Sequence, residues 1–146
     1  MKKLLLFIAL IASVSCFSQT KEWVSYRNSV AEWSNYSEKW IWGEIKYSNI
    51  PITIHGTVIK LDNKSQSNFT LYEDLGEKIS YTNDNPKVKV TSHSWLALDK
   101  DDKKCKIYMA FFNSDEYDPL TITVQYDDIL IKYYCKKKGL DSFRND

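Results

Sequence analysis

Three segments decide the fold: KCKIYMAFF (residues 104–112), LTITVQY (120–126) and ILIKYYC (129–135). In each of them apolar side chains alternate with polar or mixed ones, a period of two residues that is typical of a β-strand with one buried face. A fourth alternation precedes them and runs from Val88 to Leu98. The stretch from Lys87 to Lys136 therefore predicts four consecutive antiparallel strands.

The turns between these segments set the register of the four strands. Directly opposed residues of antiparallel strands point to the same face, so a correct register brings apolar side chains opposite one another. Turns at 99–104, 113–118 and 127–128 give these pairs: Leu98 with Cys105, Leu96 with Ile107, Met109 with Ile122, Val124 with Ile131, and Ile122 with Tyr133. Three independent turns thus predict one shared inner face. Residues 127–128 lack the glycine that tight turns favour, so a bulge in one long strand is the alternative there.

The opposite side of the same strands carries a candidate surface for a ligand or partner. Its residues form two predicted rows: Tyr108 with Thr123 and Lys132, and Ala110 with Thr121 and Tyr134. Tyrosines around a flat threonine surface suit a partner, although an ordinary solvated or helix-covered face has the same pattern. With the tryptophans upstream, the candidate surface consists of Trp33, Trp40, Trp42, Tyr108, Lys132 and Tyr134.

The segment before these strands is rich in tryptophan. Trp23, Tyr26, Val30 and Trp33 recur at three- and four-residue spacings, which fits an amphipathic helix with an aromatic stripe. Its serines and asparagines are poor helix formers. We therefore expect one short helix or an irregular segment over residues 20–38 that covers the sheet. The tryptophans then fill or cover the core, and the alternative is a platform for sugar rings or another flat ligand.

The middle of the chain predicts additional strands. Residues 39–47, 52–61 and 69–72 read as strands, with a bend or bulge at Gly56 and a turn at Gly76. Counting a short segment after that turn, the chain has about eight strands at short spacing. We expect an all-β domain, either an antiparallel sandwich or a small barrel that ends in the four-strand meander.

Residues 1–18 match an export signal. Two lysines precede a short apolar run, and Cys16 and Ser18 are small residues at the positions that a signal peptidase reads. The run is too short for a membrane span, which needs about 20 residues. We expect a single domain over residues 19–146 that is periplasmic or extracellular, and a lipoprotein anchored at Cys16 is the alternative.

The charge balance restricts the partners. The chain has 20 basic and 19 acidic residues, and cleavage after residue 18 removes two lysines, so the mature charge is 18 − 19 = −1. A near-neutral protein lacks the excess of positive charge with which proteins bind nucleic acid or anionic membranes. The remaining partners are a protein, a glycan or a small apolar ligand.

The C-terminal meander also carries a family likeness. A strand that ends at Asp99, a charged turn, Cys105 at the start of the next strand, and the step Tyr126-Asp127-Asp128-Ile129 occur together. In these features the segment from Trp95 to Tyr134 resembles a group of small exported bacterial proteins of uncharacterised function. The resemblance implies a secreted β domain and brings no activity, ligand or catalytic residue.

Cys105 and Cys135 are the two cysteines downstream of the signal. Export favours a disulfide between them. The predicted register instead places them at opposite ends of the sheet and two strands apart, whereas a disulfide needs Cα atoms within about 7 Å. We prefer two buried thiols and keep the disulfide as the alternative.

Side chains suited to catalysis or metal binding are few. Asp99, Asp101 and Asp102 share one end of the sheet with residues 127–128, which suggests a calcium site, but neighbouring lysines favour a solvated turn. The two histidines stand in strand-like segments, and no nucleophile, phosphate-loop or metal motif is present. We expect no catalytic residue, cofactor or metal. The expected function is an exported binding module, and the alternative is a lipocalin-like barrel that carries an apolar ligand.

Overall fold

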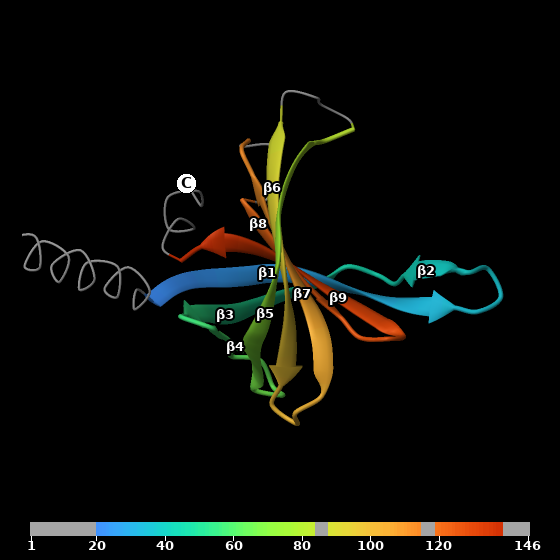
Figure 1. The fold of residues 1–146 in the computed structure, drawn as a ribbon, viewed down its shortest axis with the longest axis horizontal. Coiled ribbons are helices and arrows are strands. Elements are labelled where there is room, and N and C mark those ends of the chain that lie inside the picture. Colours follow the sequence, from blue (N-terminus) through green and yellow to red (C-terminus); the bar gives the residue numbers. More distant parts are fainter. Residues whose placement is uncertain (1–19, 84–87, 115–118, 139–146) are drawn as a thin grey trace, which may run out of the picture.

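The computed structural model describes residues 20–83, 88–114 and 119–138, which form a β-sheet of nine strands (Figure 1). The strands are β1 (Thr20–Ser34), β2 (Lys39–Trp42), β3 (Lys46–His55), β4 (Val58–Leu61), β5 (Ser67–Tyr81), β6 (Lys89–Asp99), β7 (Lys104–Phe112), β8 (Leu120–Gln125) and β9 (Ile129–Lys137). The predicted export signal and Cys16 lie outside the described residues. Within the described ranges no helix is long and apolar enough to cross a membrane.

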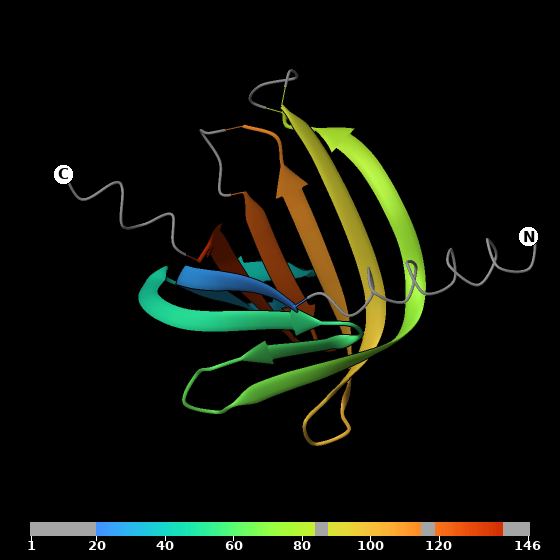
Figure 2. The ribbon, with the colours of Figure 1, turned by 90° about the vertical axis from the view of Figure 1, so that its left-hand side faces the viewer.

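The sheet closes on itself. Its order is β2-β1-β3-β4-β5-β6-β7-β8-β9, every neighbouring pair is antiparallel, and β1 also pairs with β9. Figure 2 shows the strands curling around a common interior. The prediction of an all-β antiparallel sandwich or small barrel with about eight strands is confirmed, because eight strands close the ring and β2 adds to one edge of β1.

The predicted registers of β7, β8 and β9 are confirmed. Met109 lies opposite Ile122, Val124 opposite Ile131, and Ile122 opposite Tyr133. The amide of Tyr126 donates to the carbonyl of Ile129 at 2.8 Å, so residues 127–128 form a tight turn and the bulge proposed as an alternative is wrong. One inner face thus runs across all three strands.

The predicted register of β6 is wrong by one residue. Ala97 lies opposite Cys105 and Trp95 opposite Ile107, so Leu96 and Leu98 point to the outer face. The reason is the turn after Asp99, whose amide donates to the carbonyl of Lys103 at 2.9 Å. The turn therefore has three residues and ends with Asp102 at a φ of 59°, the left-handed position common in three-residue hairpin loops.

The carboxylate of Asp99 holds this turn. Its Oδ1 accepts hydrogen bonds from the amides of Asp101 and Lys103, both at 2.9 Å, and its Oδ2 accepts one from the hydroxyl of Tyr126 at 2.8 Å. Burial acts to raise the pKa of Asp99, but the hydrogen bonds from Lys103, Tyr126 and Asp101 hold it below the ordinary value. The side chain is thus engaged in closing a hairpin.

The short helix or irregular segment expected over residues 20–38 is wrong, because residues 20–34 form β1 and residues 35–38 form the turn that follows it. The bulge between Ser25 and Arg27 explains the misleading pattern. Before it Ser25 faces Cys135 of the inner face, and after it Val30 faces Ile131, so the inward position changes from odd to even residues. Trp23 and Val30 are then seven residues apart on one face, which imitates two helical turns.

Three further strand boundaries differ from the prediction. The strand expected over residues 39–47 is divided into β2 and β3. Gly56, with a φ of 58°, lies in a turn that separates β3 from β4, so its segment is a hairpin and not one bent strand. Gly76, with a φ of 102°, lies at a bulge inside the continuous strand β5, so the predicted turn is wrong there.

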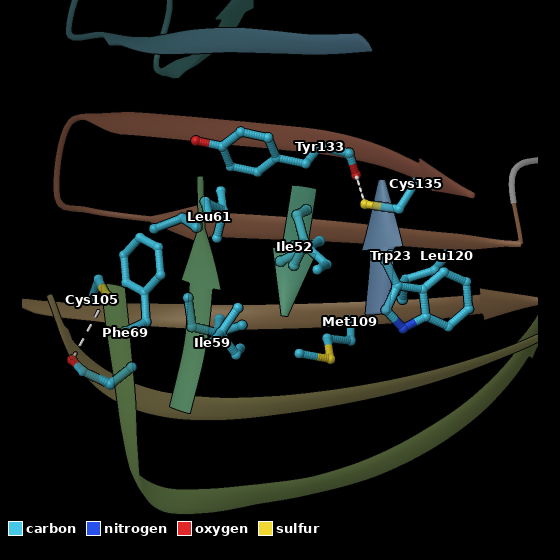
Figure 3. Close-up of a cluster of buried hydrophobic side chains, with 14 residues drawn as sticks. Trp23, Ile52, Ile59, Leu61, Phe69, Cys105, Met109, Leu120, Tyr133 and Cys135 are labelled. Atoms are coloured by element: carbon cyan, nitrogen blue, oxygen red, sulfur yellow. Dashed lines mark hydrogen bonds between the residues drawn. The ribbon is translucent and has the colours of Figure 1, made fainter. Parts of the chain in front are cut away.

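The interior of the ring is filled by apolar side chains (Figure 3). Fourteen residues form one buried cluster: Trp23, Ile52, Ile59, Leu61, Phe69, Ala97, Cys105, Ile107, Met109, Leu120, Ile122, Val124, Tyr133 and Cys135. They come from β1 and β3–β9, so every strand that closes the ring contributes to one core. Burial of this shared surface is the main favourable term that holds the ring closed.

The two cysteines are buried thiols and are not joined to each other, as predicted. Cys105 lies opposite Ala97 and donates to its carbonyl at 3.7 Å. Cys135 lies opposite Leu120 at the other end of the sheet, and its sulfur donates to the carbonyl of Tyr133 at 3.7 Å. Burial raises the pKa of the Cys105 thiol to about 11, so the thiol stays protonated at neutral pH.

Candidate functional site

The outer face of β7, β8 and β9 carries the two rows of residues predicted from the sequence. Their pairings are Tyr108 with Thr123 and Lys132, and Ala110 with Thr121 and Tyr134. Strand β1 extends this face, because Arg27 lies opposite Tyr134 and Ser29 lies opposite Lys132. We name the resulting surface the lysine–tyrosine face and define it by Tyr26, Arg27, Lys106, Tyr108, Lys132, Tyr134 and Lys136.

Cations and tyrosine rings alternate along the border between β9 and β1. The Lys132 ammonium lies 5.2 Å from the centroid of the Tyr134 ring, and the Arg27 guanidinium lies 4.3 Å from the same centroid. The Arg27 guanidinium also lies 5.5 Å from the centroid of the Tyr26 ring. The Lys136 ammonium lies 4.3 Å from that centroid. Such cation–π contacts hold flexible cationic side chains against rigid rings.

A fifth contact widens the face toward β7. The ammonium of Lys106 lies 4.7 Å from the centroid of Tyr108, which shares a row with Lys132. The side chains of Lys106, Tyr108, Lys132 and Tyr134 are all partly exposed. The face thus presents four cations together with three tyrosine hydroxyl groups and the threonines of β8.

Carboxylates are absent from the strands that form most of this face. The sequences of β7, β8 and β9 contain no aspartate or glutamate. Strand β1 has two glutamates: Glu22 receives the ammonium of Lys138 at 3.5 Å, and Glu32 lies opposite Ile129 on the inner side. Strands β7–β9 therefore contribute cationic but no anionic side chains to this face, although the chain as a whole has a net charge of only +1.

A buried hydroxyl group marks the centre of the face. Ser29 is 4% exposed and lies opposite Lys132, and its Oγ has no hydrogen-bond partner among the described residues. Buried polar atoms nearly always have a partner, which is a protein group, an ordered water or a ligand. The described protein groups therefore do not use the hydrogen-bonding capacity of this hydroxyl group.

The structure separates the predicted tryptophans from this face. Trp33 and Trp40 lie opposite each other on β1 and β2, with ring centroids 5.4 Å apart in an edge-to-face arrangement. Trp33 is six residues beyond Arg27 on β1, which corresponds to about 20 Å at the rise of a strand. Figure 1 shows the β1–β2 hairpin projecting beyond the other strands. The candidate surface thus consists of two separate parts.

A histidine–aspartate pair that the sequence did not indicate lies on the inner side of β6. His93 Nε2 is 2.6 Å from Asp74 Oδ1, and its ring stacks on Trp95 with centroids 4.1 Å apart and planes at 2°. The hydrogen bond from His93 and the amide of Gly76 hold the pKa of Asp74 below its ordinary value. Gly76 is the sequence signal beside this pair, because the register of β5 against β6 shifts between Asp74 and Gly76.

Metal ligands are not gathered into a site in the described part of the chain. No group of three or more histidine, cysteine, aspartate or glutamate side chains is arranged to hold a metal ion there. The other histidine, His55, shares a hydrogen bond of 2.7 Å with the Thr20 hydroxyl.

The fold and this face define the class of protein as a closed, all-antiparallel β domain with a basic, tyrosine-rich outer surface. Comparison with family models, with curated proteins and with solved structures found no match.

Proposed function

We propose that the protein is an exported, non-enzymatic binding module that holds an anionic glycan against the lysine–tyrosine face. The observation that carries this proposal is the continuous alternation of cations and tyrosine rings on a surface whose strands β7–β9 contain no carboxylate. Lys106 and Lys132 contact tyrosine rings and have no acidic partner among the described residues. Carboxylate or sulfate groups of a glycan would supply those partners.

The chemistry of the face favours a glycan over a nucleic acid. Single-stranded nucleic acids bind by stacking their bases on open aromatic rings. Here a cation lies over each of the rings of Tyr26, Tyr108 and Tyr134, which leaves less ring surface for stacking on bases. Their hydroxyl groups and the threonine row of β8 suit the hydroxyl groups of sugars.

The packed interior favours ligand binding at the outer surface. The alternative expectation was a lipocalin-like barrel that carries an apolar ligand inside. A carrier needs a cavity of about 300 Å³ or more inside the ring. Large residues such as Phe69 and Tyr133 point into that space and are buried by their neighbours (Figure 3). The outer face is therefore the better supported place for a ligand.

Binding of two anionic polysaccharides tests the proposal. Heparin supplies sulfate groups, polygalacturonate supplies carboxylates, and dextran is the uncharged control. We expect calorimetry at low salt to show binding of both polyanions, with an affinity that falls steeply as NaCl rises. The double variant Lys106→Ala/Lys132→Ala should bind at least about tenfold more weakly, because two charge contacts are lost.

A matched variant separates this site from general charge. Lys60 and Lys64 lie at and after β4, away from the lysine–tyrosine face, and their double alanine variant removes the same charge. That variant should keep the affinity within about twofold. The proposal fails if neither polyanion binds, if both double variants weaken binding equally, or if single-stranded DNA binds more tightly than either glycan.

A further inference from the structure

Strand β2 stands at the end of the sheet order and has a neighbouring strand on one side only. In the described part of the chain it pairs with β1 and with no other strand. An unpaired edge is a template on which another strand can add, so edge strands usually carry charges, prolines or bulges that prevent this. Strand β2 has one charged residue, Lys39, and neither a proline nor a bulge. Its edge is thus weakly protected.

The backbone groups of Trp40 and Trp42 point toward the unpaired edge. The amide of Gly43 donates to the carbonyl of Val30 at 2.8 Å, so these two residues form a hydrogen-bonded pair. Hydrogen-bonded and non-hydrogen-bonded pairs alternate along antiparallel strands. Ile41 therefore points its amide and carbonyl toward β1, whereas Trp40 and Trp42 point theirs away from β1. The edge consequently offers donors and acceptors at two alternate positions.

Both faces of the β1–β2 hairpin expose large apolar side chains beside this edge. Trp42 lies opposite Ala31 on the outer side and is 48% exposed. Trp33, which lies opposite Trp40 on the same side, is 39% exposed. Ile41 is on the inner side and is 49% exposed. An antiparallel strand at a surface usually has one solvated, polar face, so apolar groups on both faces indicate a surface that a partner buries.

The unpaired part of β5 has a different character. Strand β4 pairs with β5 only as far as Thr70, so the following residues of β5 also have an open edge. That segment has two register shifts in its pairing with β6, and it carries the charged residues Glu73, Asp74, Glu77 and Lys78. Bulges and charges of this kind oppose the addition of a strand. The edge of β2 is therefore the better suited of the two to a partner.

From these observations we infer that two copies of the chain pair through β2 as a weak antiparallel dimer with its two-fold axis at Ile41. Trp40 of one copy then lies opposite Trp42 of the other, so the outward amides and carbonyls of both copies find partners. Indoles meet on the outer face, and the two Ile41 side chains meet on the inner face. Because the segment Trp40-Ile41-Trp42 complements itself under this symmetry, a second copy fits the edge without any further sequence requirement. The inference does not rest on the proposed glycan binding.

The size of the interface predicts that the dimer is weak. Burial of the exposed indoles, Ile41 and the strand edge removes roughly 400–500 Å² per copy from solvent, compared with about 800 Å² per partner in a stable complex. We therefore expect a dimer Kd of about 10–100 µM.

Sedimentation velocity of the β domain, residues 19–146, tests the inference at concentrations between about 5 and 500 µM. The weight-average mass should rise with concentration toward that of a dimer. Ile41→Lys places two ammonium groups opposite each other at the two-fold axis and should weaken the dimer at least about tenfold. The matched control Ile79→Lys on β5 changes a side chain of similar exposure, 54%, and should leave the Kd within about twofold. Dispersed amide spectra establish that each variant is folded.

Cysteine substitutions test the register of the dimer. In Ile41→Cys the two sulfurs lie across the two-fold axis, where Cα atoms are about 4.5 Å apart and a disulfide can form. The two substituted positions of Lys39→Cys would be about 14 Å apart along the strands. Because the native thiols of Cys105 and Cys135 are buried, we expect the oxidant diamide to join Ile41→Cys into a covalent dimer and to leave Lys39→Cys monomeric.

Three results would overturn the inference. A chain that stays monomeric at about 500 µM would leave the β2 edge to an extended segment of another protein. Equal weakening of the dimer by Ile41→Lys and Ile79→Lys would place the interface elsewhere. Equal crosslinking of the two cysteine variants would show that the two-fold axis is not at Ile41.

Discussion

The register of β6 gives the sharpest prediction about the fold. Leu96 and Ala97 are adjacent, and the structure places Ala97 in the core with 0% exposure and Leu96 on the outer face opposite Lys106. Ile107, also 0% exposed, faces Trp95 and Val124 inside the ring. The loss of stability on substitution at these positions therefore depends on which face of the sheet the side chain occupies and only weakly on how hydrophobic the residue is.

Ile107→Ala should lower the free energy of unfolding by about 3–4 kcal/mol, because it removes a fully buried side chain and leaves a cavity. Leu96→Ala should cost less than about 1.5 kcal/mol, because this side chain is partly exposed. Ala97→Leu should cost about 1–3 kcal/mol, because the added atoms enter a packed core. Urea unfolding followed by circular dichroism measures all three values.

The opposite order of effects would refute this register. If Leu96→Ala cost as much as Ile107→Ala while Ala97→Leu were tolerated, Leu96 would belong to the core. The Asp99 turn would then not have the three-residue form that sets the pairing of β6 with β7.

Three further predictions concern titratable groups and thiols. Burial raises the pKa of Cys105 from 9.0 to about 11 and the pKa of Tyr133 from 10.0 to about 12. The unfolded chain therefore loses these protons at a lower pH than the folded chain does. The free energy of unfolding should be highest below about pH 9 and should fall between about pH 9 and 12. In Cys105→Ala the slope of unfolding free energy between pH 9 and 11 should decrease by up to about 1.4 kcal/mol per pH unit; an unchanged slope would show that this thiol does not contribute. Asp99→Ala should lower the free energy of unfolding by about 2–3 kcal/mol, because three hydrogen bonds are lost. In the unchanged protein this contribution should disappear as the pH falls below about 4 and the carboxylate is protonated. A variant as stable as the unchanged protein at pH 7 would contradict the turn described. Cys105 and Cys135 should react with a thiol reagent only after unfolding, and rapid reaction of the native chain would show that they are not buried.

The registers of β7, β8 and β9 could be predicted from the sequence, and the register of β6 could not. In β7–β9 every inward position is apolar and most outward positions are polar, so only one register satisfies the pattern. In β6 both Trp95–Ala97 and Leu96–Leu98 are apolar, and the hydrogen bonds of Asp99 decide between them. Hydrophobic periodicity does not contain that information.

The lysine–tyrosine face could be predicted only in part, because hydrophobic periodicity reveals local hairpins and not long-range strand pairing. The rows that contain Tyr108, Lys132 and Tyr134 follow from two local hairpins. Arg27 completes the face through the pairing of β1 with β9, which joins opposite ends of the chain. The bulge beside Ser25 also conceals the strand character of β1, so no local pattern connects this arginine with the face.

The most direct test of the central claim is a map of amide chemical shifts in the β domain, residues 19–146, as polygalacturonate fragments are added. The account predicts that the largest changes in amide chemical shift lie on β7–β9 and the adjoining part of β1, at Tyr108, Thr123, Lys132 and Tyr134. It also predicts that about 0.5 M NaCl abolishes these changes, because salt screens contacts between exposed charges. Changes confined to β3 and β4, or changes that persist in high salt, would contradict it.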